Sequence, residues 1–158
     1  MEIIVQVRTS FENVGELISR IQYISKTRLL TIQAFNPESI LSENHVIFSV
    51  RHALKAFSEK KNIAKSIETE ILLRVAATRR IEEAIIRVGV KNPKNVILFI
   101  SGDRIDEKEI FRQLDAEKLK VRFGSENEIA DKFQLGEAGN YKLEDLLLEK
   151  IALLGPDE

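Results

Sequence analysis

The alternation of apolar and polar residues along the chain predicts short strands separated by amphipathic helices. Four segments are short and rich in β-branched or alternating apolar residues, a pattern typical of strands. They are Met1–Val7, Arg28–Phe35, Asn95–Ser101 and Lys120–Phe123. Asn95–Ser101 is the most apolar of them, so we expect it in the middle of a sheet.

Apolar residues at spacings of three and four predict helices between these strands. The expected helices cover residues 11–26, 45–60, 106–117, 126–133 and 141–154, with one further turn at residues 37–42. A long central helix is predicted over residues 66–88, with Ser66 as its N-cap. Its core-facing stripe would consist of Ile67, Ile71, Val75, Ile81, Ile85 and Val88.

These elements together predict an α+β fold, with a small, mainly antiparallel sheet of about four strands packed with several helices. The chain has 158 residues, close to the commonest domain size, and contains no long linker or internal repeat. We therefore expect a single domain over residues 1–158. Residues 136–139 are predicted to form a loop, and residues 155–158 are expected to fray.

Several kinds of chemistry have no support in the sequence. The chain has no cysteine, which excludes disulfides and cysteine–histidine zinc sites. Its two histidines, His45 and His52, are seven residues apart, too far for the i, i+4 pair of a helical metal site. Glycine-rich phosphate loops and the nucleophile elbow are also missing. We expect no catalytic residues, no metal, no cofactor and no small-molecule substrate.

The sequence also predicts neither a membrane-spanning segment nor a signal peptide. No stretch of about 18 apolar residues exists, so the sequence predicts no membrane-spanning helix and no membrane partner. The apolar start, Met1–Val7, carries Glu2 and Gln6 and lacks the basic region and cleavage site of a signal peptide. We expect a cytoplasmic protein.

Charge is unevenly distributed, although the formal net charge is only −1. Residues 51–101 hold 11 basic and 5 acidic residues, whereas residues 102–158 hold 9 basic and 15 acidic ones. Lysine and arginine neutralise phosphates, which makes the middle segment a candidate RNA contact. Its basic residues include Lys55, Lys60, Lys61 and Lys65 near Asn62, and then Arg79 and Arg80. The alternative is that these charges only solvate helix faces.

The last predicted helix is apolar over more than half of its circumference. Seven of its residues are leucine or isoleucine, including Leu147, Ile151 and Leu154. Such a helix must be covered on two sides. One side would face its own domain and the other a partner protein, or else the whole helix is buried inside the fold.

An ordered set of short motifs resembles a known family. The motifs are Asn36-Pro37, Asn44-His45-Val46, Lys61–Ser66, Glu70-Ile71-Leu72, Ala77–Ile81, Ala84-Ile85, Gly89-Val90-Lys91 and Leu147–Leu154. In this order they resemble the kinase-binding accessory subunit of the KEOPS complex, a family that includes the PRPK-binding protein of eukaryotes. The compact, cysteine-free chain suits an archaeal member.

The resemblance implies a non-catalytic regulatory subunit that supports threonylcarbamoyladenosine modification of tRNA. It implies binding to the small atypical kinase of the complex and to the 3′ CCA end of tRNA. Under this interpretation, the kinase contact would be Leu147, Ile151 and Leu154. The tRNA contact would be Lys55, Lys61, Asn62, Lys65, Arg79 and Arg80, of which Arg80 occupies a position where the family more often has glutamine.

Two other functions remain open at the level of sequence. A stand-alone RNA-binding module would bind RNA tightly without a partner, although the near-zero net charge argues against it. A small-molecule enzyme would need a deep pocket that holds His45 or His52 together with carboxylates.

Overall fold

The fold is α+β, as the sequence predicts. The computed structural model describes residues 1–136 and 139–155. Within them the chain forms seven α-helices and one antiparallel four-stranded sheet. The backbone divides into two compact units. We call Met1–Pro37 with Val90–Arg122 the sheet unit, and Glu38–Gly89 with Phe123–Glu158 the helical unit.

Three sequence predictions remain untested. The assignment of residues 1–158 to one domain stays a prediction. The loop predicted at residues 136–139 and the fraying predicted at 155–158 include residues 137–138 and 156–158, which lie outside the described part of the chain.

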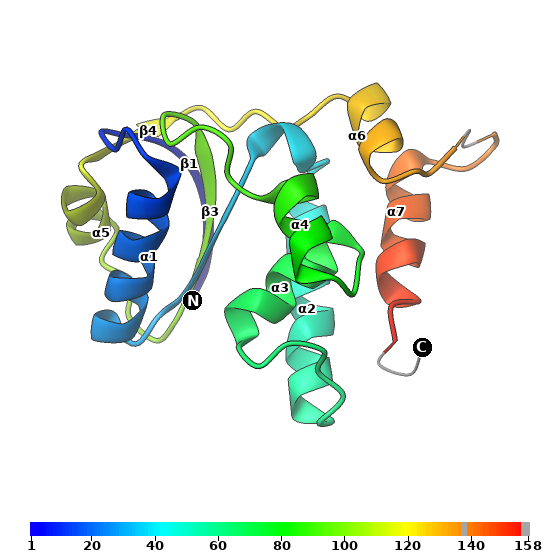
Figure 1. The fold of residues 1–158 in the computed structure, drawn as a ribbon, viewed down its shortest axis with the longest axis horizontal. Helices are drawn as coiled ribbons and strands as arrows, with labels where there is room; N and C mark the ends of the chain where they lie inside the picture. Colours follow the sequence, from blue (N-terminus) through cyan, green and yellow to red (C-terminus); the bar gives the residue numbers. More distant parts are fainter. Residues whose placement is uncertain (137–138, 156–158) are drawn as a thin grey trace. The chain divides into compact units, whose positions relative to one another are not determined.

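The sheet unit contains all four strands, in the order β2–β3–β1–β4. They are β1 (Glu2–Thr9), β2 (Thr31–Phe35), β3 (Val96–Ser101) and β4 (Ala116–Leu119). Each neighbouring pair is antiparallel, with Val5 opposite Leu98 and Ile32 opposite Ile100. The most apolar strand, β3, lies between β2 and β1, as its sequence predicts (Figure 1).

Two helices cover one face of this sheet, α1 (Val14–Arg28) and α5 (Glu107–Leu114) (Figure 1). The side chain of Asn13 caps α1 by accepting a hydrogen bond from the Glu16 N–H. Alternate strand residues and the helix stripes form one apolar core, whose buried members include Val5, Val7, Leu17, Ile21, Ile24, Leu98, Ile100, Ile110 and Leu114. Burial of this core is the main force holding the sheet unit together.

The end of α5 differs from the sequence prediction. The helix stops at Leu114, because Asp115 adopts the left-handed conformation with φ of 46°. The fourth strand then follows at once as β4, rather than at residues 120–123. The predicted boundary was therefore wrong by about one helical turn, since no glycine marks the reversal.

The helical unit consists of α2 (Glu43–Ser58), α3 (Ile67–Ala76), α4 (Ile81–Val88), α6 (Glu126–Lys132) and α7 (Leu143–Ala152). A short 3-10 turn, Pro37–Ser39, leads into it. Helix α3 packs against α2 and α4, and α7 packs against α2 and α3 (Figure 1). The Ser42 hydroxyl caps α2 by accepting from the His45 N–H, and it donates to the Glu144 carboxylate of α7.

The long helix predicted over residues 66–88 is wrong, because the structure breaks it in two. Ala77 adopts a left-handed conformation with φ of 54°, and its N–H bonds to the carbonyl of Arg74. The next N–H, of Thr78, bonds to the carbonyl of Leu73. These two bonds satisfy carbonyls at the end of α3 and reverse the chain. Helix α4 then folds back onto α3 with Ala84 and Val88 buried.

His45 lies in the core of the helical unit and is fully buried. Its Nδ1 accepts a hydrogen bond from the Leu41 N–H at 3.1 Å, which leaves Nε2 to donate to the Val75 carbonyl at 2.8 Å. The ring also lies edge-on to Phe133, with 5.5 Å between centroids. Burial disfavours the charged imidazolium and lowers the pKa of His45 to about 4. The histidine is therefore a neutral bridge between α2 and the end of α3.

We expect acid to destabilise the protein through His45. Its pKa is below the ordinary value of 6.5, so the unfolded chain takes up a proton first as the pH falls. Between pH 6.5 and about 4 the free energy of unfolding should fall by about 1.4 kcal/mol per pH unit. Urea unfolding at pH 7, 6 and 5 measures this slope.

Matched histidine variants separate His45 from other titrating groups. His52→Gln keeps the buried imidazole and should retain most of the slope. His45→Gln should shrink it to the smaller part contributed by His52, whose pKa is also lowered by burial. An unchanged slope in His45→Gln would show that other groups control acid stability.

Candidate protein and nucleic-acid interfaces

The predicted RNA contact centres on the loop between α2 and α3, residues 59–66, which we call the basic turn. Lys55 lies in the last turn of α2, and Lys61 and Lys65 project from the basic turn; all three are exposed. Lys60 adopts a left-handed conformation, with φ of 58°, and the Lys61 N–H bonds to the Ala56 carbonyl. The chain thus leaves α2 sharply and presents these lysines to solvent.

A buried carboxylate holds the basic turn in place. Glu70 Oε1 accepts hydrogen bonds from the backbone N–H groups of Ile63 at 2.8 Å and Ala64 at 2.6 Å. The Asn62 side chain donates from Nδ2 to the Ala64 carbonyl at 2.8 Å. Asn62 therefore shapes the turn, and its amide donor is directed at the backbone.

Arg74 balances the charge of Glu70. Its Nε and one terminal nitrogen donate to Glu70 Oε2 at 3.0 and 2.8 Å, and the two side chains are 4% and 0% exposed. The other terminal nitrogen donates to the Leu154 carbonyl at 2.7 Å, just after α7. One ion pair therefore connects the basic turn to the end of the last helix.

The six predicted RNA residues fall into two groups. Lys55, Lys61, Asn62 and Lys65 surround the N-terminal end of α3, whereas Arg79 and Arg80 follow its C-terminal end. A ten-residue helix is roughly 15 Å long, so α3 separates the groups by about that distance. Arg79 is half-buried, and Arg80 is exposed at the start of α4. The fold does not gather the six residues into one patch.

The predicted kinase contact on α7 needs correction. Leu147 and Ile151 are fully buried, since α7 packs this side against α2 and α3. They form part of the core and offer no surface to a partner. Leu154 is half-buried, and its neighbour Leu153 is 71% exposed. The leucine-rich pattern therefore reflects burial for most of the helix.

An apolar surface lies instead on α4. Ile81, Ile85 and Ile86 are exposed, and Ile86 is 71% accessible to solvent. Helical spacing places Ile81 and Ile85 side by side along the edge of the stripe that buries Ala84 and Val88, and places Ile86 farther round the helix, on its most exposed side. We call these three residues the apolar α4 face. The sequence pattern placed Ile81 and Ile85 in the core, because it assumed that α3 and α4 form one continuous helix.

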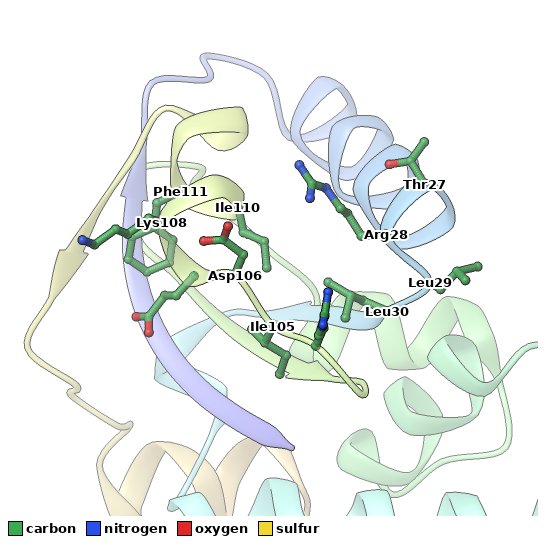
Figure 2. A pocket seen from close by; sticks show the side chains of 11 residues that line it. Thr27, Arg28, Leu29, Leu30, Ile105, Asp106, Lys108, Ile110 and Phe111 are labelled. Atoms are coloured by element: carbon green, nitrogen blue, oxygen red, sulfur yellow. The ribbon is translucent and has the colours of Figure 1, made fainter.

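A hollow of about 970 Å³ lies in the sheet unit, beside the end of α1 and the start of α5 (Figure 2). Its wall mixes apolar side chains with charged ones, and includes Leu30, Ile105, Phe111, Arg28 and Asp106. It contains neither His45 nor His52. The hollow thus gives no support to the enzyme hypothesis, which requires one of these histidines beside carboxylates.

Two further findings concern metals and membranes. Among residues 1–136 and 139–155, no three histidine, aspartate or glutamate side chains come together as ligands for a metal ion. In the same residues, no helix combines the length and apolar character needed to cross a bilayer.

We expect Glu70→Gln to destabilise the protein strongly. The amide would leave the Arg74 charge buried without its partner, which typically costs about 3–5 kcal/mol. Urea unfolding should show this loss, and amide exchange at Ile63 and Ala64 should accelerate. Glu117→Gln is the matched control, because Glu117 forms an exposed ion pair with Arg8 at 2.8 Å. Equal effects of the two variants would contradict the anchoring role of Glu70.

Comparisons with known proteins agree on one family. The family model described as kinase binding protein CGI-121 matches residues 9–155. A protein of Methanocaldococcus jannaschii named regulatory protein Cgi121 is 33% identical over 129 residues, which cover 79% of this chain and 83% of that protein. A KEOPS complex subunit Cgi121 from Pyrococcus abyssi is 29% identical over 136 residues, covering 82% and 78%. The chain belongs to the CGI-121 family of kinase-binding proteins.

Proposed function

We propose that this protein is a non-catalytic regulatory subunit of an archaeal KEOPS complex. In this role it binds the small kinase of the complex and tRNA, and so supports threonylcarbamoyladenosine modification. The family match supports the kinase partner, and the two archaeal relatives carry the names of a KEOPS subunit and a regulatory protein. The structural observation that carries the proposal is the apolar α4 face, because an exposed isoleucine cluster favours a protein partner.

The kinase contact is assigned to the apolar α4 face. Three exposed isoleucines on one short helix offer aliphatic area of the kind that protein interfaces bury. Leu154 remains a candidate at the end of α7, whereas Leu147 and Ile151 act only through the stability of the helical unit. This assignment leaves the basic turn available for RNA.

The tRNA contact is assigned mainly to Lys55, Lys61 and Lys65. These lysines are exposed near the start of α3, and their charges suit phosphates. Asn62 contributes by fixing the turn, and Arg79 and Arg80 form a second contact beyond α3. The 3′ CCA end is the expected portion of the tRNA, as the family resemblance implies.

A stand-alone RNA-binding module is the second candidate function. The basic turn is compatible with it, although the net charge of −1 is not typical of an autonomous RNA binder. Titration of the isolated protein with tRNA, in the absence of the kinase, distinguishes the two candidates.

We expect Ile86→Glu to weaken kinase binding by at least about 30-fold, the effect typical of an interface hot spot. A charge at this site would have to lose its water in the complex, while the free protein keeps its melting temperature. Calorimetric titration with the kinase of the same organism measures the affinity. Leu29→Glu is the control, since Leu29 is also exposed but lies in the sheet unit. Wild-type affinity of Ile86→Glu would overturn the α4 assignment.

We expect the double variant Lys61→Glu, Lys65→Glu to lower tRNA affinity and leave kinase binding unchanged. Loss of two phosphate contacts should reduce the slope of log affinity against log salt by roughly 2. The matched control is Lys26→Glu, Lys120→Glu, which makes the same charge change at exposed sites of the sheet unit. Equal tRNA affinity of the two double variants would show that the basic turn is not the contact.

A further inference from the structure

An aromatic pair lies on α2, in the helix that leads to the basic turn. The rings of Phe48 and His52 have centroids 4.6 Å apart and planes tilted by 39°. Both side chains are half-buried, so part of the pair faces solvent. A separation of four residues places them one helical turn apart on the same side of α2. The sequence analysis did not identify this aromatic pair.

The surroundings of His52 are positively charged. Burial is the main cause that lowers its pKa, and the charges of Arg74 and Lys55 lower it further. Lys55 lies three residues beyond His52 in the same helix, and exposed Arg51 lies beside it in sequence. The imidazole is therefore a neutral aromatic ring near neutral pH, next to cations that favour an anion.

We propose that the Phe48–His52 pair is a stacking site for an unpaired base of single-stranded RNA, with the adjoining phosphate held by Lys55. The inference rests on the proposed RNA-binding function and names the group that receives the base. A nucleotide combines a flat aromatic base with a negatively charged phosphate, and this combination matches an aromatic pair bordered by lysine. An aliphatic protein partner is better matched by the apolar α4 face.

The proposal gives α2 and the basic turn different roles in binding RNA. Lysines recognise the phosphate backbone without regard to sequence, whereas stacking requires a base that is unpaired. Phosphate contacts at Lys61 and Lys65 would orient the strand, and the ring pair would select a free end over a duplex.

Abasic RNA tests the proposal directly. The probes are a fluorescent single-stranded RNA ending in CCA and the same strand with three abasic positions at its end. The wild-type protein should bind the strand with bases at least about fivefold more tightly, as expected for one stacked base. Phe48→Leu keeps an apolar side chain of similar bulk but removes the ring, so it should bind both strands equally.

Matched variants make the outcome decisive. Phe57→Leu makes the same change at another half-buried position of α2 and should keep the preference for bases. The variant Lys61→Glu, Lys65→Glu should bind both strands more weakly. If the variant Lys61→Glu, Lys65→Glu binds both strands as tightly as the wild type, the basic-turn assignment is overturned and the stacking site is not. If Phe48→Leu still prefers the strand with bases, the stacking site is overturned. A wild-type protein that binds both strands equally would also overturn it.

Proton NMR supplies a readout that does not depend on the stability of any variant. The chain has two histidines, and His45 is fully buried, so the exposed imidazole signals belong to His52. A stacked base should shift these signals upfield, and the abasic strand should not. Identical shifts with both strands would contradict stacking on this ring.

Discussion

The buried carboxylate of Glu70 is the constraint on which the helical unit depends. It accepts two backbone N–H groups of the basic turn and pairs with Arg74, which in turn holds the carbonyl of Leu154. Removing two charges from water is costly, and only a complete set of partners offsets that cost. Here each carboxylate oxygen has partners, so the ion pair fixes three segments that are distant in sequence. The basic turn can carry exposed lysines in a defined arrangement because its backbone is held from inside.

The surface of the helical unit separates two kinds of chemistry. The apolar α4 face follows the break at Ala77, whereas the lysines of the basic turn precede α3. A protein partner gains from aliphatic burial, and RNA gains from cations and exposed rings. The two regions have no residue in common, so the proposed kinase and RNA contacts do not compete for the same side chains. This separation is what a subunit needs if it is to bind a kinase and a tRNA together.

Hydrophobic periodicity predicted most of the elements, because each strand or helix depends on residues close in sequence. It could not predict the break at Ala77, where an alanine rather than a glycine adopts the left-handed conformation. Glu70 and Arg74 were recognisable as an i, i+4 pair inside an apolar stripe, but the bond to Leu154 spans 80 residues and depends on tertiary structure. The burial of Leu147 and Ile151 likewise depends on α2 and α3, so the composition of α7 alone could not decide between core and interface.

The break at Ala77 also determines which isoleucines reach the surface. In one continuous helix, Ile81 and Ile85 would extend the stripe of Ile71 and Val75 and be buried with it. The reversal rotates α4 so that the small Ala84 and the branched Val88 pack inward, and the larger isoleucines turn outward. The left-handed alanine costs about 1–2 kcal/mol, which the close packing of α4 on α3 can offset. A local backbone reversal thus exposes residues that have a core pattern, and for this reason periodicity alone could not predict the surface that we propose for the kinase.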